Sequence, residues 1–235
     1  MKSTWLHQGQ EGDREQGRQE LIIFCSGWGM DGTPFQPLGA RKYDVLMFSE
    51  YHDLTLDCDL SPLFQRYRSV FLISWSMGVW AGQQILQPWS QCLQRAIAIN
   101  GTLCPIDDQF GIPRSIYSAT QEQFSAATRL KFYRRMCRDG RNSRGNKVFD
   151  TFLAYQPQRS VANQALELLA LSRQVDCHPA ETSIYTDILI ADQDLIVPTA
   201  NQEAFWQGQK KRHVEGSHFL FYDWKSWDEL LDTVL

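Results

Sequence analysis

The chain has 235 residues, of which 43% are hydrophobic and 21% charged, and its formal net charge is −4. These values are ordinary for a soluble globular protein, and the length fits one α/β domain with room for an inserted subdomain. Met1 to Glu20 lack the apolar stretch of a secretory signal, and no apolar run elsewhere reaches membrane-spanning length. We therefore expect a cytoplasmic protein without a membrane partner.

Apolar runs with the length of buried strands alternate with helix-compatible segments from residue 21 onward. The expected strands are 21–25, 43–48, 70–75, 95–100, 184–191 and a weaker 212–215, and the expected helices are 77–87, 198–207 and 225–234. Continuous apolar strands that alternate with helices predict an α/β fold, with a mostly parallel sheet covered on both faces. The polar residues 1–20 are expected to form a flexible lead-in.

Residues 104–180 interrupt this alternation. They lack strand-like runs and instead show helical spacing over 122–138 and 161–171, punctuated by prolines. Ligands bind at the carboxyl edge of open α/β sheets, and a helical insertion between two strands would cover that edge. We expect a core formed by 21–103 and 181–235, with 104–180 as a helical lid.

Basic residues are concentrated in one part of the predicted lid. Segment 129–147 carries eight Lys and Arg residues against one acid, which leaves −11 on the rest of the chain. Such a run is commonly a solvated face, but it can also steer and hold an acidic partner. Nucleic acid fits poorly, because the overall balance is acidic and no nucleic-acid motif occurs.

The cysteines show no paired spacing. They are spread without a C-x-x-C pair, at Cys25, Cys58, Cys92, Cys104, Cys137 and Cys177. This pattern argues against a structural zinc site and against a disulfide framework, so we expect reduced thiols.

The segment Ser74-Trp75-Ser76-Met77-Gly78 joins an expected strand to an expected helix. A sharp strand-to-helix turn holds a serine hydroxyl clear of the backbone, with the next N–H groups aimed at what the serine attacks. An ordinary βα loop with serine turn chemistry is the alternative. Ser74 stands where glycine is most usual in this motif, and it is small enough to fit there at modest strain.

A serine nucleophile needs a base, and the base needs an acid that fixes its tautomer. In α/β-hydrolases the chain order is serine, acid and histidine, with the last two on loops after late strands. Asp194 follows the expected strand 184–191, and His218 follows the last one. We predict Ser76 as nucleophile, His218 as base and Asp194 as acid, with Asp192 as the alternative acid.

A tetrahedral intermediate also requires donors for its negative charge. The backbone N–H of Met77, directly after the serine, is one candidate. The second is the N–H of Trp28, in the glycine-rich loop after the first expected strand. A plain glycine turn is the alternative for that loop.

Longer motifs carry a family resemblance. They are Phe24-Cys25-Ser26-Gly27-Trp28-Gly29, Trp75-Ser76-Met77-Gly78-Val79-Trp80, Asn100-Gly101-Thr102, Phe110-Gly111-Ile112-Pro113 and the run from Thr128 to Cys137. With these, from about Leu21 to the C-terminus, the chain resembles the BioG-type pimeloyl-[acyl-carrier protein] methyl ester esterases of biotin synthesis. The resemblance implies an α/β-hydrolase in which Ser76, Asp194 and His218 are catalytic, Trp28 and Met77 are the oxyanion donors and Phe132 lines the acyl channel.

The implied reaction is hydrolysis of the methyl ester of pimeloyl-[acyl-carrier protein], without a metal or an organic cofactor. Acyl carrier proteins are acidic, so the resemblance assigns carrier contacts to basic residues of one predicted helix: Lys131, Arg134, Arg135 and Arg138. We expect a monomer with this carrier as its partner. A thioesterase or a short-chain carboxylesterase with the same residues remains open, as does a non-catalytic module that binds the carrier.

Overall fold

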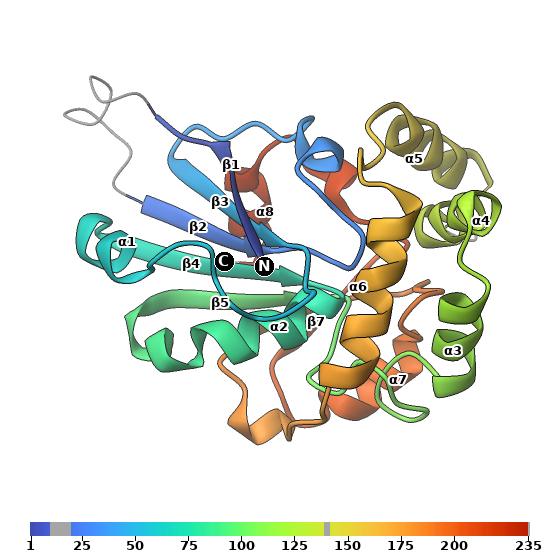
Figure 1. The fold of residues 1–235 in the computed structure, drawn as a ribbon. Helices are drawn as coiled ribbons and strands as arrows, with labels where there is room; N and C mark the ends of the chain where they lie inside the picture. The colour runs from blue at the N-terminus through green and yellow to red at the C-terminus, as the bar shows by residue number, and fades with distance from the viewer. Residues whose placement is uncertain (10–19, 139–141, 235) are drawn as a thin grey trace.

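The computed structural model describes residues 1–9, 20–138 and 142–234, and within them a seven-stranded sheet forms the centre. Its strands are β1 (Lys2–His7), β2 (Glu20–Cys25), β3 (Tyr43–Ser49), β4 (Ser69–Trp75), β5 (Leu93–Ile99), β6 (Asp187–Ala191) and β7 (Lys211–Val214). They lie in the order β1-β3-β2-β4-β5-β6-β7 (Figure 1). All neighbouring strands are parallel except β1, which runs antiparallel to β3.

Two groups of helices surround the sheet. Those that follow strands of the core are α1 (Ser61–Arg66), α2 (Met77–Leu86), α7 (Thr199–Phe205) and α8 (Trp227–Val234). Those between β5 and β6 are α3 (Arg114–Glu122), α4 (Ala126–Cys137), α5 (Asn142–Ala154) and α6 (Val161–Gln174). Short 3-10 turns cover Thr33–Phe35, Gln87–Cys92, Ala180–Thr182 and Phe221–Asp223. Within the described ranges, no helix is both long and apolar enough to traverse a lipid bilayer.

Helices α3 to α6 gather beyond one end of the sheet (Figure 1). This mostly parallel sheet, flanked by helices and carrying a helical insertion between two strands, confirms the predicted α/β-hydrolase fold. We refer to residues 104–180 as the insertion. It lies over the strand ends that carry the candidate site, since residues from both line one cleft.

Alternation along β2 gives each face of the sheet its own core. Ile22 and Phe24 pack in one buried cluster, which also contains Trp227 of α8. Leu21 and Ile23 belong to the other cluster, together with side chains of α2 and α7. Because helices cover both faces, the strand reads as a continuous apolar run.

The N-terminal residues differ from the expected flexible lead-in. Lys2–His7 forms β1, which pairs with β3 at the edge of the sheet. Trp5 and Leu6 pack against different core clusters, one on each face. This short strand has few apolar residues, so the polar composition of residues 1–20 as a whole gave no indication of it. Of that segment, residues 10–19 lie outside the described residues.

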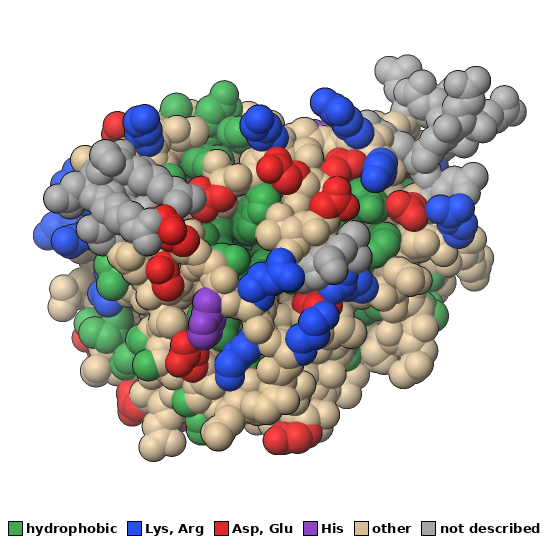
Figure 2. All heavy atoms as spheres, turned by 180° about the vertical axis from the view of Figure 1, so that it is seen from behind, with side chains coloured by type: hydrophobic (Ala, Val, Ile, Leu, Met, Phe, Trp, Pro, Cys, Tyr) green, Lys and Arg blue, Asp and Glu red, His purple; other side chains and the backbone are tan. Residues whose placement is uncertain are grey.

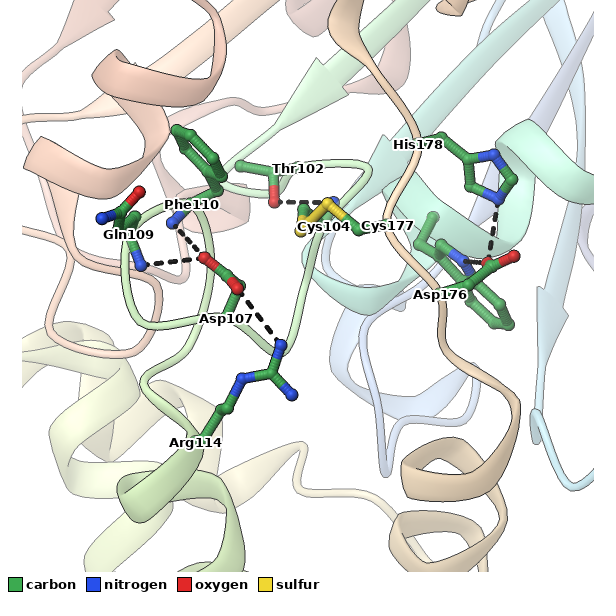
Figure 3. The surroundings of a disulfide bond; sticks show 10 residues. Thr102, Cys104, Asp107, Gln109, Phe110, Arg114, Asp176, Cys177 and His178 are labelled. Carbon is green, nitrogen blue, oxygen red and sulfur yellow. Dashed lines mark hydrogen bonds and ion pairs between the residues drawn. A yellow bond between two sulfur atoms is a disulfide. The ribbon is translucent and has the colours of Figure 1, made fainter.

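Cys104 and Cys177 form a disulfide, so the expectation of reduced thiols is wrong for this pair. Figure 3 shows the bond between the loop after Thr102 and the segment that carries His178. The insertion leaves the sheet after β5 and returns before β6, and these strands are paired neighbours. Its two ends therefore meet, with the His178 N–H donating to the Leu103 carbonyl at 3.0 Å. Because the two cysteines are 73 residues apart in the sequence, their spacing did not indicate that they lie close together.

Candidate active site

Ser76 occupies the sharp turn between β4 and α2. Its φ is +58°, in the left-handed region that residues other than glycine rarely adopt. The turn is tight because α2 packs closely on β2, where a Cβ at Gly78 would lie 2.1 Å from the Cys25 carbonyl oxygen. This is the strained strand–turn–helix geometry that projects a serine hydroxyl from the end of a sheet.

A glycine on α2 makes room for Ser74 in place of the usual glycine of this motif. Ser74 is fully buried. A Cβ at Gly82 would lie 2.5 Å from Ser74 Oγ and 2.7 Å from the Tyr185 hydroxyl. The space that the motif commonly leaves on the strand is therefore left on the helix.

The Cys25 thiol is buried close to Gly82, where an added Cβ would lie 3.4 Å from its Sγ. Burial raises its pKa to about 12, so it stays protonated at neutral pH. A protonated thiol is a poor nucleophile, which leaves the Ser76 hydroxyl as the nucleophilic candidate at this turn.

Ser76, His218 and Asp194 form a hydrogen-bonded series. Ser76 Oγ lies 2.9 Å from His218 Nε2, and His218 Nδ1 lies 2.7 Å from Asp194 Oδ2. All three residues are buried. A carboxylate only accepts hydrogen bonds, so Nδ1 of the imidazole carries the proton. Nε2 is then the acceptor for the serine hydroxyl.

Asp194, and not Asp192, reaches the histidine. The second oxygen of Asp194 accepts two backbone N–H groups of the following turn, at 2.8 and 2.9 Å. Asp192 is exposed and instead accepts the N–H of Gly216 at 2.9 Å. The structure therefore brings together the residues that the chain order favoured.

Two buried amides to which the sequence analysis assigned no role hold these loops. Gln202 of α7 donates to Asp194 Oδ2 at 2.9 Å. Asn100, directly after β5, donates to the His218 carbonyl at 2.9 Å and accepts the N–H of Ala191 at 2.7 Å. The place of Asn100 after a strand was a usable signal, whereas Gln202 is one of many glutamines and nothing in its neighbourhood marks it.

A cleft opens onto Ser76 and His218, as is typical of a small-molecule site. Its walls are largely apolar and include Trp28, Ile112, Ile116, Phe132, Met136, Leu168, Leu195 and Ile196. Phe132 of α4 packs edge to face against Trp28, with ring centroids 5.0 Å apart. The sequence-predicted channel residue thus lies in the wall beside the predicted oxyanion loop.

Trp28 and Met77 both line this cleft. In the described part of the chain, no protein acceptor takes the backbone N–H of either residue. Both groups are therefore without a protein acceptor among the described residues, a condition that the donors of an oxyanion site must meet.

The basic residues predicted to contact a carrier are exposed on α4 and at the residue after it: Lys131, Arg134, Arg135 and Arg138. Arg135 also lines the cleft, and the Arg134 guanidinium lies 5.1 Å from the centre of the Phe149 ring. In Figure 2, basic side chains stand at the left edge of the view, over the end of the molecule that holds α4 and α5. Residues 139–141 of the basic segment lie outside the described residues.

A family model described as pimeloyl-ACP methyl esterase BioG matches residues 10–230. The chain belongs to the BioG family. The match begins before Leu21, where the motifs alone placed the start of the resemblance.

Solved and sequence relatives agree with membership of the BioG family. The crystal structure of BioG from Haemophilus influenzae has a TM-score of 0.81 and 32% identity, covering 97% of this chain and 98% of that one. An uncharacterized protein of the same species is 34% identical over 220 residues, which are 91% of this chain and 95% of that protein.

A malonyl-[acyl-carrier protein] O-methyltransferase of Bacteroides fragilis is 38% identical to this chain over 204 residues. The match covers 86% of this chain but 40% of that protein. The BioG-family chain therefore spans less than half the length of this relative.

Proposed function

We propose that this protein hydrolyses the methyl ester of pimeloyl-[acyl-carrier protein], giving pimeloyl-[acyl-carrier protein] and methanol in biotin biosynthesis. The observation that carries the proposal is the Ser76–His218–Asp194 series at the base of an apolar cleft, in a chain of the BioG family. The lid role of the insertion belongs to the same proposal.

In this proposal Ser76 Oγ attacks the ester carbonyl while His218 Nε2 accepts its proton. The imidazolium, held in place by Asp194, then protonates the leaving methanol, and water resolves the acyl-enzyme by the same route. The N–H groups of Trp28 and Met77 stabilise the oxyanion, each worth about 3 kcal/mol if it behaves as a typical donor of this kind. The chemistry requires no metal and no organic cofactor.

The shape and charge of the site support a carrier-bound substrate. The apolar walls fit a methylene chain, which would run from Ser76 toward the mouth of the cleft. Arg135 lines the cleft and is also exposed on α4, next to the other basic residues of that helix. A guanidinium in that place suits the phosphate of a phosphopantetheine arm, with the acidic carrier outside.

The Bacteroides relative supports a methyl ester as the substrate. Its name describes an activity that adds a methyl group to a carrier-bound malonyl group, and our chain matches 40% of its length. We infer that the matched part is a hydrolase and that the remainder carries the methyl transfer. A methyl ester made by one part of such a protein is the bond that the other part would cleave.

The products separate this proposal from its rivals. Purified protein incubated with methyl-pimeloyl-carrier protein should release methanol and leave the carrier acylated. A thioesterase would release the free carrier thiol without methanol. Ser76→Ala should lower the rate by at least about 10⁴-fold, whereas Ser115→Ala, an exposed serine of α3, should leave it within twofold.

A non-catalytic carrier-binding module would behave differently from both hydrolases. It predicts that a fluorophosphonate probe does not label Ser76 and that Ser76→Ala still supports growth without biotin in cells lacking the pathway esterase. Labelling of Ser76 together with loss of growth on Ser76→Ala would reject the module.

A further inference from the structure

Helix α6 of the insertion holds the loop that carries Trp28. We call residues 27–30 the Trp28 loop. The N–H of Gly29 donates to Glu167 Oε2 at 3.1 Å, and its carbonyl accepts from Gln164 Nε2 at 2.7 Å. The Trp28 indole N–H donates to the backbone carbonyl of Gln164 at 3.0 Å. Side-chain and main-chain groups of one helix thus grip this loop at three points.

Glu167 is fully buried and receives several donors. Arg159 Nη1 lies 2.6 Å from its Oε2, and the backbone N–H of Tyr51 donates to its Oε1 at 2.8 Å. Arg159 also donates to the carbonyl of Met30, at the end of the Trp28 loop. Burial raises the pKa of Glu167, while the Arg159 guanidinium opposes this rise. A buried ion pair is stable only when its remaining polar atoms are bonded, and here the Trp28 loop supplies some of those bonds.

The Trp28 loop belongs to no strand or helix, so the hydrogen bonds of regular secondary structure do not hold its backbone. Gly29 has φ +77°, a conformation that glycine adopts readily. The Trp28 N–H lies one peptide before the bonds made by Gly29. Because α6 holds the next peptide and the indole, it restricts the rotations of Trp28 that would turn this N–H.

We propose that Gln164 and Glu167 are positioning residues for the Trp28 N–H, acting through Gly29. Helix α6 is then part of the catalytic framework, and motion of the insertion is left to the helices that do not bind this loop. The inference rests on the proposed role of the Trp28 N–H as an oxyanion donor.

The central test is Gln164→Leu. Leucine keeps a similar volume but removes the donor to the Gly29 carbonyl. The matched control is Gln174→Leu, the same change on the same helix, where the side chain donates to the His52 carbonyl at 2.9 Å and does not contact the Trp28 loop. Glu167→Gln is the second variant, because a carboxamide cannot accept from every donor that now converges on the carboxylate.

Two readouts report on the oxyanion site without a known substrate. The first is the rate constant for fluorophosphonate labelling of Ser76, and the second is the kcat and KM for a small methyl ester. We expect Gln164→Leu to slow labelling and lower kcat by about 10- to 100-fold, with KM within threefold, as when an oxyanion donor is lost. Gln174→Leu should stay within twofold for both.

The outcomes separate this inference from the proposed function. A wild-type protein that the probe does not label would refute the proposed function itself. If wild type is labelled and Gln164→Leu is labelled equally fast, or loses no more than Gln174→Leu, the positioning role is wrong. Thermal melting identifies a variant that fails to fold, and Glu167→Gln then decides in its place by the same criteria.

Discussion

Near the turn that carries Ser76, a glycine on the helix leaves the space that a glycine on the strand leaves in the usual motif. The elbow motif usually begins with glycine so that strand and helix can approach closely. Here the strand carries Ser74, and the missing space is found at Gly82 of α2. The close approach is preserved because only one of the two facing positions has to lack a side chain.

Gly82→Ala should therefore destabilise the protein by about 1–3 kcal/mol, as overpacking of a core does. Its Cβ would meet Ser74 Oγ and the Tyr185 hydroxyl. Ser74→Gly removes the first clash but not the second, so the double variant should recover part of the loss. Denaturant unfolding of the wild type, both single variants and the double variant gives the coupling. Additive effects, to within about 0.5 kcal/mol, would show that the two positions do not compensate each other.

Some site residues were predictable from the sequence and others were not, for one physical reason. Ser76, Asp194 and His218 are marked by chain order and by strand ends, which are local features of a parallel sheet. Glu167 is recognised only by bonding partners such as Gly29, which comes from a distant part of the chain. Gln202 is recognised only by its bond to Asp194, which depends on how the chain folds between the two residues. A buried amide or carboxylate carries no sequence pattern that distinguishes it from a solvated one.

At the scale of elements, the helices of the insertion differ in what they contact. Helix α6 bonds to the Trp28 loop, whereas α4 exposes its basic side chains and contributes Phe132 to the cleft. A charge on α4 can therefore attract or repel a partner that binds at the cleft. A charge on the exposed face of α6 lies away from the cleft.

Charge reversal on α4 should weaken recognition of the carrier. Lys131→Glu combined with Arg135→Glu places two acids one helical turn apart on the exposed face of α4, the second of them at a residue that lines the cleft. We expect the ratio of kcat/KM for carrier-bound methyl ester to that for a small free methyl ester to fall about tenfold or more, and to depend less on salt. The comparison variant is Arg173→Glu, an exposed basic residue in the last turn of α6. Equal losses on both esters would argue against docking through α4.

Among the strands, too, only those with a local sequence pattern were predictable. The parallel strands were predictable because burial on both faces makes them continuous apolar runs. The edge strand β1 is only partly buried and pairs on one side, so its residues show no such run. Tertiary pairing with β3, rather than local composition, makes this segment a strand.

At the scale of the whole molecule, the Cys104–Cys177 bond joins the two ends of the insertion to each other, next to the strands that it connects. Closing a loop of this length restricts the unfolded chain, and the chain-entropy estimate for its stabilisation is about 4 kcal/mol. The double variant Cys104→Ser/Cys177→Ser should lose up to that amount in denaturant unfolding. Cys92→Ser, at an exposed free cysteine, should change stability by less than about 0.5 kcal/mol.

Thiol titration checks the same bond directly. Unfolded protein should show four thiols before reduction and six after it. Six thiols without reductant would mean that the bond is absent from the protein, and the stability loss of the double variant should then vanish as well.

The bond also makes the insertion a covalent ring in which a single backbone cut does not divide the molecule. A protease that nicks the chain between Cys104 and Cys177 would leave two pieces that migrate as one band until a reductant is added. A form cut between α3 and α4 would keep α6 covalently attached beside the strand ends. The cut would give α3 and α4 one free chain end each. Comparing the activity of forms that are cut in different loops would therefore show which loops of the insertion must stay continuous for the reaction.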